Sequence, residues 1–290
     1  MNHTEPGIFV RHGPSAASVP VVFDSPHSGD QYPADFDFSC PLKLLRQAED
    51  AHVDALFAGA PMSGATLVSA LFPRSYIDVN RAVEDIDLQL LDGNWPGPIA
   101  ASDRARVGMG LVRRVCKPGL AVYNRRLSVE EIKRRIDVYY RPYHQAVGDA
   151  IDEASARFGA VWHINCHSMP SSRGPRGPVR GWERADFVLG DRDGTTCGIG
   201  FRSMIQGTLE RLGYDVRIND PYKGVELVRR FGMPGIGRHS LQIEVNRRLY
   251  MNEETLERTA GFAELKRNID SLVQAIAAYA GDPLTAAAAD

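Results

Sequence analysis

Two short apolar segments, far apart in the chain, each lead directly into a histidine. Residues 21–23 run into a polar turn that carries His27, and residues 161–166 run into His167. Apolar runs of this length, bounded by turn residues, are typical of buried strands. Ligands of open α/β sheets bind beyond the carboxyl ends of the strands, so the two histidines are predicted to meet over one site.

Further strand and helix patterns alternate along the chain. Strands are predicted at 64–71, 75–81, 187–189, 214–218 and 240–247, and helices at 42–57, 128–154, 199–212 and 253–279. This alternation predicts an α/β fold with a mixed, mostly parallel sheet that helices cover on both faces. We expect one domain over residues 1–290, with 1–18 and 280–290 as a peripheral N-terminal extension and tail, and with 8–10 as a candidate edge strand.

The long helix at 128–154 has the clearest local signals. Ser128 and Glu131 form an S-x-x-E capping box, which begins a helix by satisfying its first free N–H groups. Pro142 interrupts the apolar repeat that follows, and a proline inside a helix removes one hydrogen bond. The sequence therefore predicts a kink near Tyr139.

The charge composition argues against a polyanionic partner. The formal net charge is -2, and Lys and Arg are scattered, so no nucleic-acid surface is predicted. Of the 34 basic residues 5 are lysines, which leaves 29 arginines. Planar guanidinium groups suit the recognition of carboxylates, so we expect a small-molecule ligand that carries them.

Cysteine usage and hydropathy indicate a reduced, non-membrane environment. The 4 cysteines are widely spaced without a Cys-x-x-Cys pair, so neither a disulfide framework nor a zinc knuckle is predicted. The N-terminal residues lack an apolar leader, and no run reaches membrane-spanning length. We expect a cytoplasmic protein with no membrane contact; the sequence carries no signal for an oligomeric state.

Carboxylates stand where they could join the two histidines. Asp50 and Asp54 are four residues apart and share a face of the predicted helix at 42–57, and Glu244 lies in a core-like strand. Two histidines and a carboxylate, with an open position for water, are the ligand set of a catalytic zinc site. A further carboxylate can take the proton of that water, the general-base role we assign to Glu244.

Each of these residues also has a structural interpretation. A strand-end histidine can be an ordinary core residue, the acidic helix face can simply be solvated, and Glu244 can pair with an arginine. Two irregular segments add to the functional interpretation: residues 84–108 could form a lid, with disorder as the alternative, and the arginine-bearing loop at 170–184 could clamp a substrate.

Seven motifs, in order, resemble the N-formylglutamate amidohydrolase (deformylase) family. The resemblance covers residues 20–252, and its motifs are Ser25-Pro26-His27-Ser28-Gly29 with Tyr32-Pro33, Glu49-Asp50-Ala51-His52-Val53-Asp54, Tyr76-Ile77-Asp78-Val79-Asn80-Arg81, Tyr140-Arg141-Pro142-Tyr143-His144, Asn165-Cys166-His167-Ser168-Met169-Pro170, Asp186-Phe187-Val188-Leu189-Gly190-Asp191 and Leu241-Gln242-Ile243-Glu244-Val245-Asn246-Arg247. That family is related to zinc carboxypeptidases and aspartoacylase-like deacylases. The resemblance therefore implies a phosphorylase/hydrolase-like α/β sheet with one catalytic zinc ion.

The resemblance also implies roles for individual residues. His27 and His167 would be zinc ligands, Glu244 would activate the water, and Asn80 with Arg81 would hold a substrate carboxylate. A guanidinium binds a carboxylate through two parallel hydrogen bonds, which agrees with that last role.

The motifs leave more than one candidate for the third zinc ligand. Carboxypeptidases place it three residues after the first histidine, where this chain has Asp30. The formylglutamate family instead has acidic residues at the positions of Asp50 and Asp54. We choose Asp50, with Asp54 as a substitute or as a residue that supports the ligands.

These roles predict the zinc-dependent hydrolysis of N-formyl-L-glutamate, or of a similar N-acyl amino acid, by metal-activated water. Asn80, Arg81, Arg141 and Arg229 are predicted to bind substrate carboxylates. Residues 226–230 depart from the family pattern, which leaves the acyl or amino-acid specificity open. The alternatives are a zinc hydrolase for another N-acyl amino acid or short peptide, and a non-catalytic carboxylate-binding protein. A serine hydrolase that uses Ser28 or Ser168 is disfavoured because the chain has no G-x-S-x-G motif.

Overall fold

A single eight-stranded sheet forms the centre of the molecule. The computed structural model describes residues 2–171 and 185–282, and within them the strand order is β1-β2-β4-β3-β9-β12-β10-β11. The strands are β1 (His3–Glu5), β2 (Phe9–His12), β3 (Val21–Ser25), β4 (Thr66–Ala70), β9 (Val161–Met169), β10 (Phe187–Gly190), β11 (Val216–Ile218) and β12 (Arg238–Asn246).

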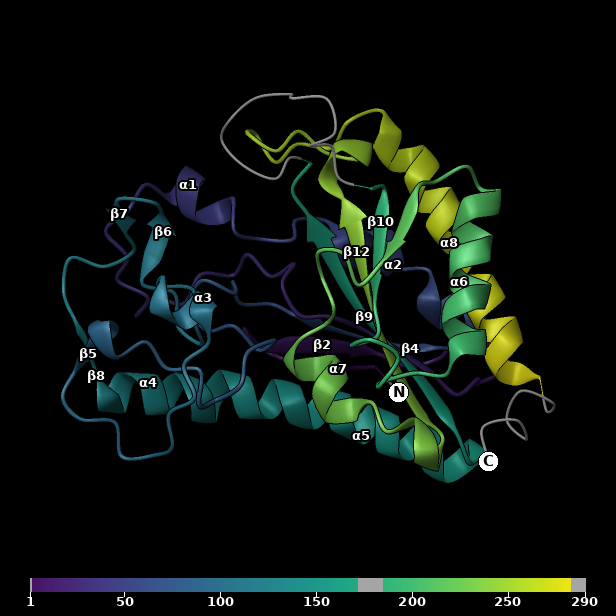
Figure 1. Ribbon diagram of the computed structural model, residues 1–290, viewed down its shortest axis with the longest axis horizontal. Helices are drawn as coiled ribbons and strands as arrows, with labels where there is room; N and C mark the ends of the chain where they lie inside the picture. The colour runs from purple at the N-terminus through teal and green to yellow at the C-terminus, as the bar shows by residue number, and fades with distance from the viewer. Residues whose placement is uncertain (1, 172–184, 283–290) are drawn as a thin grey trace.

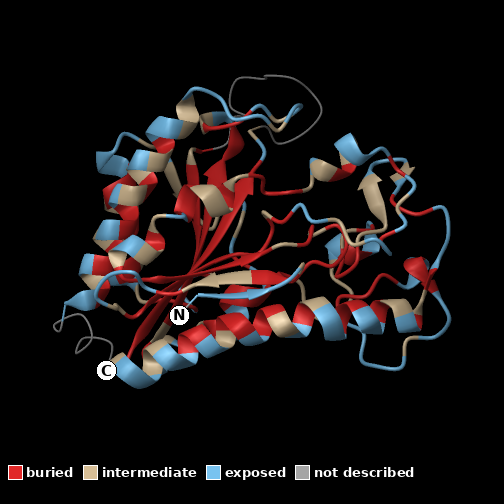
Figure 2. Cartoon of the chain, turned by 180° about the vertical axis from the view of Figure 1, so that it is seen from behind, coloured by how far each residue is buried: buried red, intermediate tan, exposed pale blue. Residues whose placement is uncertain are grey.

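The four central strands, β4, β3, β9 and β12, are parallel to one another, and antiparallel pairs join them to both flanks. This confirms the expected mixed, mostly parallel sheet. All nine residues of β9 are buried, as Figure 2 shows for the strands around it. Such continuous burial is typical of strands that are covered on both faces.

Helices cover both faces of this sheet (Figure 1). The helices of the described ranges are α1 (Leu42–Arg46), α2 (Val53–Phe57), α3 (Asp103–Arg106), α4 (Val129–Arg135), α5 (Arg141–Phe158), α6 (Ile199–Arg211), α7 (Glu226–Phe231) and α8 (Gly261–Gly281). Apolar residues of α5 and α7 pack in one core on one face, and those of α2, α6 and α8 pack in a second core on the other.

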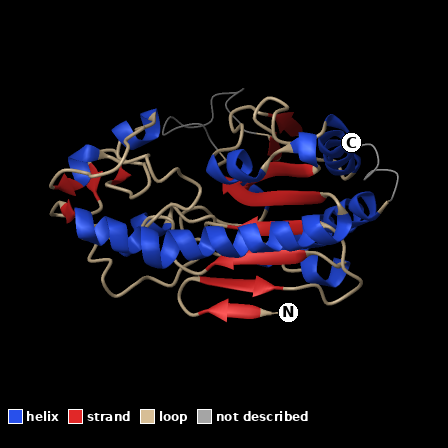
Figure 3. Ribbon diagram, turned by 90° about the horizontal axis from the view of Figure 1, so that it is seen from below, coloured by secondary structure: helices blue, strands red, loops and turns tan. Residues whose placement is uncertain are grey.

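The long predicted helix is present and lies over the sheet, running roughly along the direction of the strands in Figure 3. Its capping box is confirmed: the Ser128 hydroxyl accepts from the N–H of Glu131, and the Glu131 carboxylate accepts from the N–H of Ser128. Instead of a simple kink, a π-helical turn, η3 (Ile136–Tyr140), joins α4 to α5. The wider turn lies directly before Pro142, whose missing N–H cannot continue a regular α-helical ladder.

A group of small elements extends beyond one end of the sheet (Figure 1). Besides α1 and α3 it contains β5 (Leu91–Asp92), β6 (Val115–Lys117), β7 (Leu120–Ala121), β8 (Leu127–Ser128) and the 3-10 helix η2 (Leu88–Leu90). Residues 84–108, expected to be an irregular lid or disordered, are thus partly regular. Three further 3-10 turns lie elsewhere: η1 (Ala60–Ser63), η4 (Pro234–Ile236) and η5 (Arg247–Leu249).

The prediction of a strand at 75–81 is wrong. Its backbone forms successive turns, in which the N–H of Tyr76 donates to Pro73 and the N–H of Arg81 donates to Asp78. The alternation of polar and apolar residues that suggested a strand arises because Asp78 and Asn80 are both drawn into a buried polar site.

Three other boundaries differ from expectation. The helix predicted at 42–57 is broken between α1 and α2, where His52 has the left-handed φ of 67°. The last helix begins at Gly261 rather than near 253. The strand expected at 8–10 is present as β2 (Phe9–His12), but it is not the edge strand, because β1 pairs with its outer side. The loop at 172–184 and the tail at 283–290 lie outside the described residues.

None of the described helices combines the length and the apolar character that a membrane span requires.

Candidate functional site

The two strand-end histidines meet at the carboxyl edge of the sheet. His27 follows β3 and His167 lies in β9, and these two strands are parallel neighbours. Their ring centroids are 4.7 Å apart, and both residues are buried. The prediction that the two strand ends share one site is therefore confirmed.

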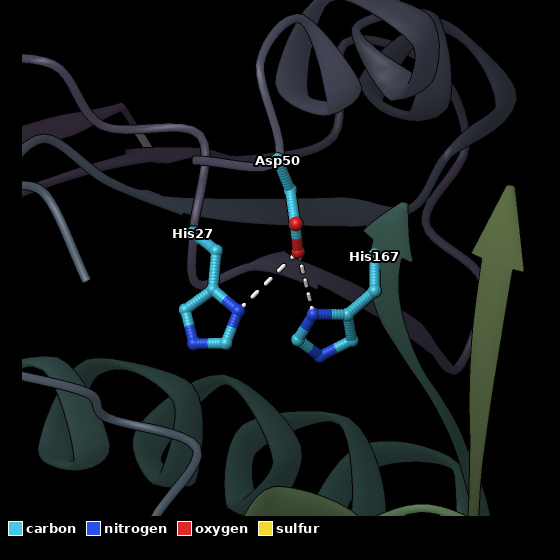
Figure 4. A group of neighbouring side chains, drawn as sticks. All are labelled: His27, Asp50 and His167. Atoms are coloured by element: carbon cyan, nitrogen blue, oxygen red, sulfur yellow. Dashed lines mark hydrogen bonds and ion pairs between the residues drawn. The ribbon is translucent and has the colours of Figure 1, made fainter. Parts of the chain in front are cut away.

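Asp50 joins the histidines from the break between α1 and α2. Its N–H donates to the carbonyl of His27 at 2.9 Å, which fixes the loop against the first strand end. Its Oδ2 lies 3.3 Å from Nδ1 of His27 and 3.0 Å from Nδ1 of His167 (Figure 4). Ligand atoms of the three residues lie within 4.8 Å of one another, so this cluster could hold a metal ion.

The groups beside the two Nε2 atoms show whether both Nδ1 atoms are available to bind a cation. Nε2 of His27 lies 2.7 Å from Oδ1 of Asp78, and Nε2 of His167 lies 2.7 Å from Oδ1 of Asn165. With the ring proton on Nε2, where both partners can accept it, each Nδ1 presents a lone pair toward Asp50. Two lone pairs then face a carboxylate oxygen, an arrangement that a bound cation satisfies.

The other candidate acids lie outside this cluster. Asp54 lines a separate cavity beside the N-terminal strands, and its pKa is raised by burial. Asp30 is exposed and pairs with Arg46 at 3.3 Å. Of the three carboxylates considered from the sequence, Asp50 is thus the one that the fold brings to both histidines.

Two arginines surround the cluster and balance its acids. Arg247 donates to Oδ1 of Asp50 at 2.9 Å, and Arg74 donates to Oδ2 of Asp78 at 2.8 Å. Burial alone would raise the pKa of Asp50, but hydrogen bonds with His167 and His27 and the charge of Arg74 bring this pKa well below its usual range. The pKa of Asp78 is lowered in the same way, chiefly by Arg74 and His27 against the opposing effect of burial. Both carboxylates are therefore ionised.

A second buried polar network supports His167 from below. Asn165, whose side-chain oxygen faces His167, donates its amide to Oδ1 of Asp24 at 2.8 Å. Asp24 also lies 2.9 Å from Nε2 of His163 and accepts from the Tyr143 hydroxyl at 2.8 Å. His163 and the Ser240 hydroxyl lie 2.7 Å apart, as a base and a nucleophile would. Both are almost completely buried, however, and neither lines the cavity that opens over the His-Asp-His cluster. This network therefore positions His167 and does not supply a serine nucleophile.

Glu244 faces the same site from the neighbouring strand. It pairs in register with His167 across β12 and β9, and its Oε1 accepts from the amide of Gln242 at 2.9 Å. Burial, opposed in part by the charge of His167, raises the pKa of Glu244 to about 7. A carboxylate with a pKa near neutrality is suited to exchange a proton.

A cavity of about 400 Å³ opens over this cluster. Its wall includes both histidines, Asp50 and Glu244, and it is rich in cations: Arg74, Arg81, Arg104, Arg113, Lys223 and Arg247. Asn80 also lines it; the Asn80 amide lies 3.0 Å from Nε2 of His167, and its oxygen accepts from the N–H of Leu227 at 3.0 Å. Asn80 and Arg81 thus both line the cavity over the His-Asp-His cluster.

Arg141 and Arg229 are not brought to this cavity. Arg141 is exposed on α5 and pairs with Asp137 at 2.8 Å, and it lines a different surface cavity. Arg229 is exposed, pairs with Glu226 on α7 at 2.8 Å and is not among the lining residues of this cavity. Both side chains are exposed on helices, so the cavity lining lends no support to these two predictions, which stay untested.

Sequence reasoning missed several residues of the site: Asp24, Arg74, Asp78, Arg113, Asn165, Gln242 and Arg247. A signal existed for some of them, because residues 163, 165 and 167 alternate with apolar residues and so share one face of a strand. The neighbouring strand carries a second polar row at 240, 242 and 244. The arginines had no comparable signal.

The fold and the site together define an α/β enzyme whose buried His-Asp-His cluster could hold a metal ion. The family model for N-formylglutamate amidohydrolase matches residues 19–251, and the chain belongs to this family, whose members hydrolyse an amide bond.

Individual relatives agree with this assignment. A crystal structure of N-formylglutamate amidohydrolase from Ralstonia eutropha JMP134 is 47% identical, with a TM-score of 0.90, over 94% of this chain and 98% of that chain. An N-formylglutamate deformylase from Pseudomonas putida is 28% identical over 81% of this chain and 83% of its own length. The Agrobacterium tumefaciens protein Atu2144, 19% identical with a TM-score of 0.65 over 93% of this chain and 95% of that chain, shares the fold. The family expected from the seven motifs is confirmed.

Proposed function

We propose that this protein hydrolyses N-formyl-L-glutamate to formate and L-glutamate, with a zinc ion held by His27, Asp50 and His167. One observation carries the metal assignment: the two Nδ1 atoms and a carboxylate oxygen of Asp50 converge, while each Nε2 lies beside an oxygen that can accept its proton. Family membership and the names of the relatives support the substrate.

A zinc ion in such a site polarises a carbonyl and lowers the pKa of a bound water to about 7. Glu244 acts as the general base: it accepts a proton from the attacking water as the oxygen adds to the formyl carbon. When the carbon–nitrogen bond breaks, Glu244 returns this proton to the departing amine. Gln242 keeps one Glu244 oxygen occupied, which directs the other toward the cavity.

Arg74 supplies positive charge next to the reacting carbonyl. Its guanidinium is half-buried beside Asp78 and Asp50, and the charge of Glu244 also acts on it. A fixed cation in a water-poor site stabilises the negative charge that develops on the carbonyl oxygen.

Asn80 and Arg81 bind the α-carboxylate of the substrate. That carboxylate is two bonds from the scissile nitrogen and must therefore lie near the metal cluster, where Asn80 contacts His167. The Tyr140 hydroxyl donates to the backbone carbonyl of Arg81 at 2.9 Å and so fixes this turn from behind.

The experiment is a substrate panel assayed with wild type, Glu244→Gln and His167→Ala. We expect release of formate from N-formyl-L-glutamate by the wild type, with N-acetyl and N-succinyl glutamate and dipeptides as weaker substrates. Glu244→Gln should keep its zinc and lose most turnover, whereas His167→Ala should lose both. Faster cleavage of an N-acetyl amino acid or a dipeptide would redirect the assignment to a related hydrolase, and full activity of Glu244→Gln would refute the general-base role.

A further inference from the structure

The cavity holds more positive charge than its own acids neutralise. Arg74 and Arg247 bind the acids of the metal cluster, and Lys223 pairs with Asp193 at 2.9 Å. In contrast, the side chains of Arg81, Arg104 and Arg113 form no hydrogen bond or ion pair within residues 2–171 and 185–282. A cavity built in this way is prepared for an anionic ligand.

Arg113 differs from Arg104, which is exposed at the rim. Arg113 is half-buried, and burial together with the nearby charge of Arg74 lowers its pKa to about 10. The charge of Asp78 opposes this shift only in part. A partly buried cation that forms no ion pair costs free energy unless a ligand supplies the opposite charge. The placement of Arg113 is therefore difficult to explain by stability alone.

The backbone around Arg113 is fixed to the metal site. The N–H of Asp78 donates to the carbonyl of Leu111 at 2.8 Å, and the N–H of Leu111 donates to the carbonyl of Asp85 at 2.9 Å. On the other side, Arg114 donates to Asp87 at 2.6 Å. A Cβ at Gly110 would come within 2.5 Å of the carbonyl oxygen of Asp85, so the close approach of this segment requires glycine. Arg113 is thus held ready rather than ordered by the ligand.

The number of unpaired cations has a consequence for the ligand. A ligand with a single carboxylate would engage Arg81 beside Asn80 and leave the half-buried Arg113 without an ion pair among the described residues. A ligand with two carboxylates would satisfy both guanidinium groups, each through a charge-assisted pair of hydrogen bonds. Glutamate, with its second carboxylate at the far end of a flexible side chain, meets this requirement.

We propose that Arg113 binds the side-chain carboxylate of the substrate and selects acidic N-acyl amino acids over neutral ones, while Arg81 binds the α-carboxylate. This proposal rests on the proposed function and extends it by assigning the residue that recognises the substrate side chain. Arg104 adds positive charge at the rim of the same wall.

The test compares two variants with the wild type on three substrates. Arg113→Met and Arg81→Met are assayed with N-formyl-L-glutamate, with N-formyl-L-glutamine, which lacks the side-chain charge, and with N-formyl-4-aminobutanoate, which lacks the α-carboxylate. Arg113→Met should lower kcat/KM about 100-fold for the two substrates that carry the distal carboxylate, and less than about 3-fold for N-formyl-L-glutamine. Arg81→Met should instead lower kcat/KM for N-formyl-L-glutamate and N-formyl-L-glutamine, and should have little effect on N-formyl-4-aminobutanoate, which lacks the α-carboxylate.

Two further variants control for folding and charge. Arg113→Lys keeps the charge without the planar fork and should recover part of the activity. Arg106→Met removes an exposed arginine that pairs with Asp103 outside the cavity, and it should behave as the wild type. Equal losses on all substrates for Arg113→Met, or an exchange of the two patterns between Arg81 and Arg113, would overturn the assignment.

Calorimetric binding of glutarate to the zinc-loaded enzyme separates this proposal from the proposed function. Glutarate carries both carboxylates and no scissile bond, and glutaramate lacks one of the charges. If the wild type hydrolyses none of the substrates but binds glutarate more tightly than glutaramate, and Arg113→Met abolishes the preference, the proposed function fails and the role of Arg113 stands. If N-formyl-L-glutamate is hydrolysed and Arg113→Met keeps the full preference for glutarate, the role of Arg113 fails alone.

Discussion

Replacement of Glu244 by Gln should stabilise the metal-free protein while it removes activity. Burial raises the pKa of Glu244 from its usual 4.5 to about 7, so at pH 8 the folded protein carries a buried charge that it disfavours. At 1.36 kcal/mol for each tenfold change in acidity, this shift corresponds to a cost of about 3 kcal/mol. Gln keeps the shape and can still accept from Gln242, but it carries no charge.

The gain should depend on pH in a defined direction. Between pH 4.5 and about 7 the folded protein holds a proton on Glu244 that the unfolded chain has released, so the free energy of unfolding falls as the pH rises through this window. The Gln variant lacks this term. Its advantage should therefore be full above pH 7 and vanish near pH 4.5.

Thermal unfolding with a chelator present measures this effect. We expect Glu244→Gln to melt about 5 °C above the wild type at pH 8, and the difference to shrink toward zero near pH 5. Glu131→Gln is a control of opposite sign, because Arg125 lowers the pKa of Glu131 to about 2 and the loss of this ion pair should lower the melting temperature. A Gln variant at position 244 that melts below the wild type at pH 8, or a difference independent of pH, would refute the reasoning.

Three further predictions concern other parts of the structure. Asn165→Leu removes the acceptor of His167 Nε2 and should weaken zinc binding about 10- to 100-fold in a chelator competition, whereas unchanged affinity would exclude a supporting role for the Asp24 network. Burial lowers the pKa of His144 to about 4, so the unfolded chain gains a proton first as the pH falls below about 6.5, and the free energy of unfolding should fall with it. His144→Gln can still donate to the carbonyl of Val79. In denaturant titrations this variant should lose about 2 kcal/mol less stability than the wild type between pH 7 and pH 5. Arg141→Met should leave kcat/KM for N-formyl-L-glutamate within about 2-fold of the wild type, because Arg141 lies outside the cavity, and a large loss would return it to the substrate site.

The positions of His27, His167 and Glu244 could be predicted because they depend on a local pattern. Each follows or interrupts an apolar strand, and the parallel arrangement of β3, β9 and β12 brings neighbouring strand ends together. The sheet itself followed from the alternation of strands and helices for the same reason. Asp50 could be chosen over Asp30 only through the resemblance to a family, because both are acidic residues in loops near His27.

The residues that were missed depend on long-range packing. Asp78 lies in a segment whose alternating pattern imitates a strand, although tertiary hydrogen bonds fold it into turns. Arg113 could not be distinguished among 29 arginines, because nothing in its local sequence records that its side chain is half-buried and lines the cavity. Arg141 was favoured for its place in a motif, yet the helix turns its side chain toward solvent.

The most direct test of the whole account is a zinc titration of the metal-free enzyme, followed by the release of formate from N-formyl-L-glutamate. Activity should rise in proportion to added zinc and level off at about one ion per chain. His167→Ala should show no such rise at the same zinc concentrations. Full formate release by the chelator-treated wild type, with no response to zinc, would contradict a metal-dependent hydrolase built on His27, Asp50 and His167.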